Sequence, residues 1–170
     1  KANDAHAEWK AGLTWLQAQV QSDGQLAGEE RSMALPLQSR SEVVRTLEAT
    51  ASVVPSTLLA AVDRASSAPS VEFLARQVLA LKSEGSNSSA KLTVLLAMQN
   101  SDGGFGASKG YGSNALDTAW ALQALAGELG AVTQAEAAVG WLLSRQNTDG
   151  SWPMVTDGDL LYPTAVVADA

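Results

Sequence analysis

Apolar residues recur every three or four positions along most of this chain, as they do on the buried face of an amphipathic helix. The spacing is clear in residues 4–21, where Trp9, Leu13, Leu16 and Val20 follow one another at intervals of 4, 3 and 4. No stretch shows the strict alternation of apolar and polar residues that is typical of a half-buried strand. The sequence therefore predicts an all-α fold.

Further helices are expected where the same spacing continues and start and stop signals flank it. Ser39 to Glu42 and Thr133 to Glu136 both match a capping box, in which a serine or threonine and a later glutamate satisfy the first helical amides. Glycines at 24, 85 and 130 are expected to end helices, and Leu129 to close one buried face. The expected helices cover residues 4–21, 43–54, 56–62, 69–79, 89–99, 114–129, 133–146 and the chain from Tyr162 onward.

One polar turn occurs three times, each time between a helical pattern and an apolar residue. It is clearest at residues 141–152, closely copied at 95–105 and more weakly copied at 15–26. Asp102 and Asp149 lie 149 − 102 = 47 residues apart, a plausible length for a helical hairpin. We interpret the chain as one domain of repeats, approximately 1–55, 56–85, 86–130 and 131–170.

The residue types in this turn predict how it works. An Asp-Gly pair permits a sharp reversal with positive φ at the glycine. Gln99 and Gln146 are expected to hydrogen-bond an unsatisfied amide at the start of a neighbouring helix. Phe105 and Trp152 are expected to fill the seam between adjacent hairpins with a large apolar ring. These residues are therefore interpreted as structural.

The turn resembles the QW motif of the terpenoid cyclase and protein prenyltransferase superfamily. The resemblance lies in Gln146-x-x-x-Gly150-x-Trp152 behind Trp141-Leu142-Leu143, and in Gln99-x-x-x-Gly103-x-Phe105 followed by 116–122. It implies an α/α toroid, a ring in which outer helices alternate with inner ones. That family closes its ring with about six hairpins, so the smaller number expected here implies an incomplete or open ring, or a fragment of a larger protein.

Charge and composition limit the classes of partner and of site that we expect for this chain. Eleven basic and eighteen acidic residues give 11 − 18 = −7, with no basic stripe for nucleic acid or anionic membranes. No apolar run reaches the ~18 residues of a membrane span. The chain has no cysteine, so disulfides and thiolate metal sites are excluded. We expect an exported protein, secreted or held at the cell surface or in the periplasm, whose export signal has been removed.

The catalytic groups implied by the resemblance are incomplete. Terpenoid cyclases of the protonating class use the central acid of Asp-x-Asp-Asp-Thr-Ala, and the matching window here, 114–119, retains only Asp117 of the three acids. Leu116 stands in the place of the proton donor and cannot act as a general acid. Asp117 is then interpreted as a carboxylate that favours the positive end of a helix dipole.

Metal and cofactor sites are not predicted either. The zinc site of the prenyltransferases needs Asp, Cys and His, whereas this chain has no cysteine and a single histidine, His6. The glycine-rich segment 103–110 lacks the Gly-Lys-Ser/Thr ending of a phosphate-binding loop. Asp149, Asp157 and Asp159 do not complete a calcium loop and are interpreted as turn residues.

The sequence thus favours a non-catalytic repeat module that presents a concave surface to a protein, a glycan or a small hydrophobic ligand. A fragment of a terpenoid cyclase or prenyltransferase-like enzyme is one alternative. A polysaccharide lyase on an α/α toroid is another, although Arg145 and Lys109 are the only basic residues near the turns. The expected binding residues lie at the starts of two inner helices and in the loop before one of them: Tyr111, Asn114, Asp117, Thr118, Tyr162 and Thr164.

Overall fold

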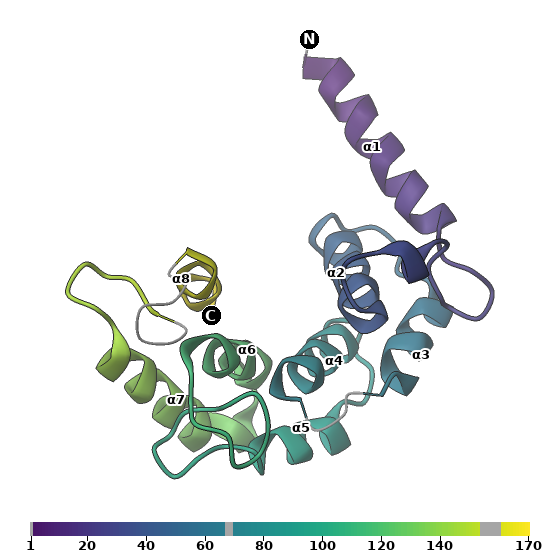
Figure 1. The fold of residues 1–170 in the computed structure, drawn as a ribbon. Helices are drawn as coiled ribbons and strands as arrows, with labels where there is room; N and C mark the ends of the chain where they lie inside the picture. Colours follow the sequence, from purple (N-terminus) through teal and green to yellow (C-terminus); the bar gives the residue numbers. More distant parts are fainter. Residues whose placement is uncertain (1, 67–69, 154–160) are drawn as a thin grey trace. The chain divides into compact units, whose positions relative to one another are not determined.

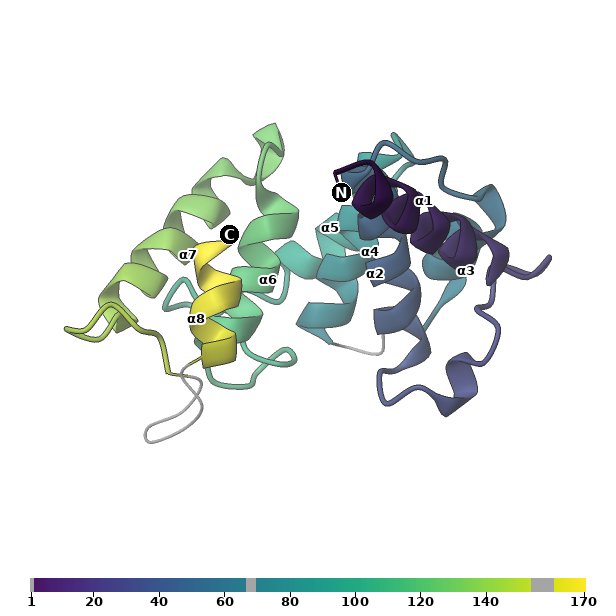
Figure 2. The ribbon, with the colours of Figure 1, turned by 90° about the horizontal axis from the view of Figure 1, so that it is seen from above.

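The computed structural model describes residues 2–66, 70–153 and 161–170, with side chains from Ala7 onward. These residues form eight α-helices and two 3-10 turns, and their only β-type pairing is a single bridge between Val20 and Leu26. The prediction of an all-α fold is confirmed (Figures 1 and 2). The elements are α1 (Ala2–Ala18), η1 (Glu29–Arg31), α2 (Pro36–Ala49), α3 (Ser56–Arg64), α4 (Val71–Ser83), α5 (Ser89–Leu96), α6 (Ala115–Leu125), η2 (Leu129–Ala131), α7 (Val132–Arg145) and α8 (Leu161–Ala168).

The chain divides into two compact units. The first comprises Lys1–Ser66 with Ala80–Ser86, and the second comprises Ser67–Leu79 with Asn87–Ala170. The cut falls within α4, whose first residues belong to the second unit and whose last turn belongs to the first. In the part of the chain that the structure describes, no helix is both long and apolar enough to cross a membrane.

The first unit is built on the pair α2 and α3. Val44 and Leu47 of α2 and Leu58 and Val62 of α3 are fully buried, as the helical spacing of these residues predicts. The loop between α1 and α2 is fixed by Glu29, whose carboxylate accepts hydrogen bonds from the Leu26 amide and the Arg40 guanidinium. The hydrogen bond from Arg40 lowers the pKa of Glu29 below its ordinary value, so this ion pair persists at neutral pH.

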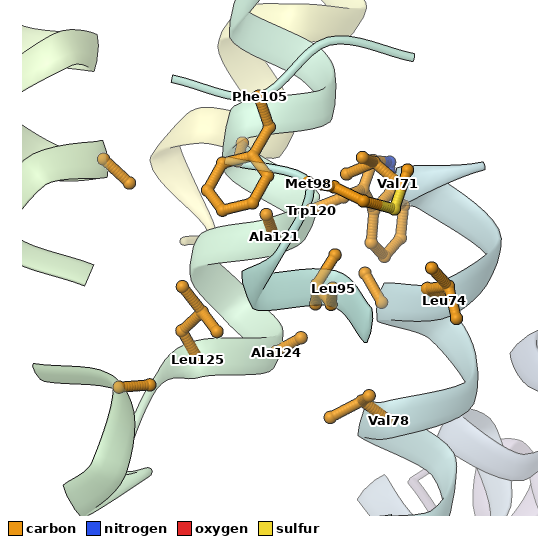
Figure 3. Packing of buried hydrophobic residues seen from close by; sticks show 14 of the residues in the cluster. Val71, Leu74, Val78, Leu95, Met98, Phe105, Trp120, Ala121, Ala124 and Leu125 are labelled. Atoms are coloured by element: carbon orange, nitrogen blue, oxygen red, sulfur yellow. The ribbon is translucent and has the colours of Figure 1, made fainter. Parts of the chain in front are cut away.

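The second unit is organised around α6, which contacts α5, α7 and α8. Helix α6 can be surrounded in this way because alanines dominate its surface and allow close approach. Figure 3 shows its side chains meeting Val71, Leu74 and Val78 of α4 and Leu95 of α5. Its own members of this core are Ala119, Trp120, Ala121, Ala124 and Leu125.

The two predicted capping boxes are wrong. Helix α2 begins at Pro36 rather than near Ser39, because a proline has its φ already set for the first helical position. The Leu35 amide donates to the side chain of Gln38 at 3.0 Å, so the first turn is satisfied without a serine cap. Helix α7 begins at Val132 directly after a 3-10 turn, which places Thr133 inside the helix.

Helix ends also differ from expectation. Helix α6 ends at Leu125 and the left-handed residue after it is Gly127, with φ +76°, rather than Gly130. Leu129 therefore leaves the helix and is 93% exposed instead of buried. Gly85, with φ +65°, follows the end of α4 as predicted. The predicted helix start at Pro69 lies outside the described residues.

Candidate functional site

The three polar turns have the same hydrogen bonding. We call residues 20–26, 99–105 and 146–152 the first, second and third corners. In each, the glycine N–H donates to the carbonyl three residues earlier at 2.9–3.0 Å, and the aspartate Oδ1 accepts from the amide two residues later at 3.0 Å. The glycine φ values are +83°, +91° and +88°. The sequence prediction that Asp-Gly makes a sharp reversal with positive φ is thus confirmed.

The glutamine before the turn binds a carbonyl and not, as predicted, an amide. Nε2 of Gln99 donates to the carbonyl of Gly103 at 2.8 Å, and Nε2 of Gln146 donates to the carbonyl of Gly150 at 3.0 Å. Gln99 Nε2 also donates to the carbonyl of Gln134, in the first turn of α7. The glutamine at position 99 therefore reaches a neighbouring helix start, but as a donor.

The second and third corners each join the helix that follows them through a threonine hydroxyl. Oγ1 of Thr118 accepts the Phe105 amide at 2.9 Å, and Oγ1 of Thr164 accepts the Trp152 amide at 2.9 Å. Phe105 is fully buried in the core, whereas Trp152 is half-buried with its indole donating to the carbonyl of Leu142. Both threonines are thereby engaged in holding backbone rather than in facing a ligand.

Two of the three corners pack against a later helix. In the first unit a Cβ on Gly24 would overlap the carbonyl of Thr57 in α3, and Arg64 donates to the carbonyl of Asp23 at 3.2 Å. In the second unit a Cβ on Gly103 would lie 2.8 Å from the carbonyl oxygen of Ala137 in α7. Glycine is therefore required both for its φ and for the close approach of a helix.

Asn114 and Asp117 form a closed pair at the start of α6. The Asn114 side chain accepts the Asp117 amide at 2.9 Å and donates to Asp117 Oδ2 at 2.6 Å, so Asn114 caps the helix. Asp117 is 7% exposed, and this burial, with the nearby charge of Glu72, raises the pKa of its carboxyl above the ordinary value. The sequence placed Asp117 in the first helical turn but offered no sign that it is buried.

An arginine near this pair was missed by the sequence reasoning. Arg76 of α4 is 6% exposed, lies 4.1 Å from the centre of the Trp120 ring, and donates from Nε to Glu72 at 2.8 Å. The i, i+4 spacing of Glu72 and Arg76 was the available signal. This arrangement neutralises a buried guanidinium and presents it to an aromatic face.

No protein-family model and no curated protein matches this chain. The resemblance to the terpenoid cyclases and prenyltransferases therefore stays a prediction from the sequence.

The remaining two residues expected to bind a ligand are exposed tyrosines in the second unit. Tyr111 is 66% exposed in the loop before α6, and Tyr162 is 49% exposed in the first turn of α8. Helices α6 and α8 are in contact and their N-terminal ends lie on the same side in Figure 2. Of the expected set, the structure thus leaves the two tyrosine rings available and engages Asn114, Thr118 and Thr164 in local contacts.

An apolar hollow that the sequence did not predict lies between the end of α6 and the first half of α7. Its volume is 390 Å³. That value falls within the range of small-molecule sites. The hollow forms because the chain turns at Gly127 and leaves Leu129, Val132 and Val139 exposed. Its lining residues are Leu125, Ala126, Gly127, Glu128, Leu129, Val132, Ala135, Glu136 and Val139.

The described part of the chain does not gather side chains for metal binding. Among the described residues no three histidine, aspartate or glutamate side chains gather in a way that could hold a metal ion. Asp157 and Asp159 lie outside the described residues, and Asp149 turns its Oδ1 to Ser151 in the third corner. Arg145, a basic residue considered for a lyase, lies 5.3 Å from the Trp141 ring centre, and Lys109 is exposed in a loop.

Proposed function

We propose that this chain is a non-catalytic helical-repeat module whose second unit binds a small hydrophobic ligand or an apolar side chain of a protein partner. The observation that carries this proposal is the hollow of 390 Å³ between α6 and α7. Ligand sites of that size are mainly apolar with a few polar groups at their edge. Here leucine, valine and alanine make the walls, and Glu128 and Glu136 disfavour an anionic ligand.

We also propose that the helices form an incomplete α/α toroid of hairpin repeats, related to the terpenoid cyclase and prenyltransferase fold. Three corners with matching hydrogen bonds and glycine φ values support it. So does the packing of two of these corners on a helix later in the chain, at a similar sequence separation in each case: Gly24 on Thr57 and Gly103 on Ala137.

The engagement of the polar groups supports a binding role over catalysis. The hydroxyls of Thr118 and Thr164 hold backbone groups, and Asn114 is used as a helix cap. A binding module needs such rigid positions beneath its surface, whereas general acid–base catalysis needs polar groups that reach the substrate.

The proposal is tested with N-phenylnaphthylamine, a neutral probe whose fluorescence rises in apolar sites. We expect the wild-type chain to bind it, Val139→Lys to abolish binding, and the Tyr111→Ala/Tyr162→Ala double variant to retain it. Val139 is 41% exposed at the hollow, so lysine there introduces a charge without disturbing the core. Loss in the tyrosine variant alone would place the site at the surface expected from sequence, and no binding by wild type would overturn the proposal.

A fragment of a terpenoid cyclase is the second candidate, and Asp117 favours it. Burial raises the pKa of this carboxyl, and a raised pKa is the direction that a proton-donating carboxyl requires. Leu116 in the donor position argues against it. If the wild-type chain turns over polyprenyl substrates and Asp117→Asn does not, the chain is an enzyme and the proposal of a non-catalytic binding module is wrong.

A further inference from the structure

The second corner has a contact face that is occupied by α7. Nε2 of Gln99 donates to the Gln134 carbonyl at 2.8 Å, and the indole Nε1 of Trp141 donates to Asp102 Oδ2 at 3.0 Å. Between these two bonds, Gly103 lies against the backbone of Ala137. A helix with a tryptophan four residues after a small residue thus fits one side of a corner.

The third corner has a corresponding contact face. No helix of the described chain packs on it. Its internal bonds match those of the second corner, including Gln146 Nε2 to the Gly150 carbonyl. All residues from Gln146 to Gly150 are exposed, and a Cβ on Gly150 would meet only Gln146 of the same corner, at 3.9 Å. Asp149 Oδ1 accepts from the amide and the hydroxyl of Ser151, and within the described residues no tryptophan indole donates to this carboxylate as Trp141 does to Asp102.

Helix α1 carries the complementary half of this contact. Trp15 stands six residues before Gln21 of the first corner, as Trp141 stands six before Asn147 of the third. Four residues before each tryptophan is an alanine, Ala11 in α1 and Ala137 in α7.

In α1 the contact face is exposed. Trp15 is 62% exposed, Ala11 and Gly12 are exposed, and a Cβ on Gly12 would meet nothing within 4 Å. Figure 1 shows α1 extending beyond the other helices of its unit.

We propose that α1 of one molecule docks on the third corner of a second copy of this chain. The Trp15 indole then donates to Asp149 of the second copy, as Trp141 does to Asp102, and the Ala11 backbone lies against Gly150. Gln146 donates to the carbonyl of Glu8, which corresponds to Gln134. A second copy is the occupant that supplies every matching group, since the exposed tryptophan face and the open corner occur on the same chain.

Contact of two different surfaces makes the association head-to-tail, so each partner keeps one free face and growth continues with concentration. The contact is small, centred on one tryptophan that buries roughly 150–250 Å². It falls well below the size of a stable interface, so we expect association in the micromolar to millimolar range.

Complementation between two variants tests this arrangement by sedimentation velocity. Trp15→Arg blocks the helix and Asp149→Arg blocks the corner, and both positions are exposed, so we expect each variant to keep its fold, as checked by circular dichroism. We expect the average mass of wild type to rise with concentration, each variant alone to stay monomeric, and their equimolar mixture to form a dimer and no larger species. Thr14→Arg, on another face of α1, should associate like wild type.

Three results would overturn the proposal. The first is a wild-type chain that stays monomeric at millimolar concentration, which would mean that the third corner does not bind a second copy of the chain. The second is association that Trp15→Arg abolishes and Asp149→Arg leaves intact, which would indicate pairing of two α1 helices. The third is failure of the mixed variants to dimerise. Asp149→Asn, which keeps the Oδ1 acceptor for Ser151, separates loss of the docking contact from damage to the corner.

Discussion

The indole Nε1 of Trp141 donates a hydrogen bond of 3.0 Å to Oδ2 of Asp102, which precedes it by 39 residues. Burial alone would raise the pKa of Asp102. Hydrogen bonds from Ser113, the Gly104 amide and Trp141, with the charge of Arg145 nearby, instead hold that pKa below its ordinary value. The carboxylate is therefore ionised at neutral pH, and it ties the second corner to α7.

Replacing Trp141 with phenylalanine should remove this bond and keep most of the buried ring. Because Asp102 is largely exposed and water can replace the indole, we expect a loss of about 1 kcal/mol in the free energy of unfolding. Urea unfolding of the variant and wild type measures it. The control is Trp9→Phe, at a position that is 54% exposed. This control should change stability by less than about 0.5 kcal/mol. Equal losses in the two variants would show that neither the bond to Asp102 nor the packing of the buried indole contributes to stability.

Alanine at Gly103 and at Gly150 should have unequal effects. Both glycines have φ near +90°. Each substitution therefore carries about 1 kcal/mol of backbone strain. Only at Gly103 would the new Cβ also meet the Ala137 carbonyl, at 2.8 Å. We expect Gly103→Ala to lose a further ~1–3 kcal/mol, typical of an overpacked contact. Thermal unfolding compares the pair, and equal destabilisation would mean that α7 does not pack on the second corner.

The buried hydroxyl of Thr118 should be required for the link between the second corner and α6. Thr118→Val keeps the shape of the side chain but leaves the Phe105 amide without its partner. We expect this variant to lose about 1–3 kcal/mol. Thr118→Ser restores the hydroxyl and should recover much of that loss, apart from the missing methyl group. A valine variant as stable as the serine variant would contradict the role of this hydrogen bond.

Asp117 should make the protein less stable as the pH rises. Its pKa is raised in the folded state. The unfolded chain therefore ionises first, and stability falls from about pH 4 upward until the folded carboxyl also ionises. Asp117→Asn cannot ionise and should remove this fall, gaining on wild type as the pH rises from acid to neutral. The free energy of unfolding is measured by urea titration across that range. Parallel curves for the two proteins would show that the pKa of Asp117 is not raised.

The corners were predictable from the sequence because their hydrogen bonds are local. Asp102 binds the amide of Gly104, and Gly103 adopts positive φ within the same turn, so residue type and order decide the geometry. The all-α fold was predictable for a similar reason, since apolar spacing along one helix needs no knowledge of its neighbours. The direction of the glutamine bonds was not predictable, because a glutamine amide can donate or accept, and the second partner of Gln99, Gln134, is 35 residues away.

Residues alone determined that this chain is helical and where its three corners lie. Only the tertiary structure decided which of the expected surface residues are engaged, burying Thr118 and Asp117 and leaving Tyr111 exposed. It also decided that Leu129 and Val139 border a hollow rather than a core. The physical reason is that burial depends on which helix packs against a residue, and that is set by contacts far apart in sequence, whereas a turn is set by its own few side chains.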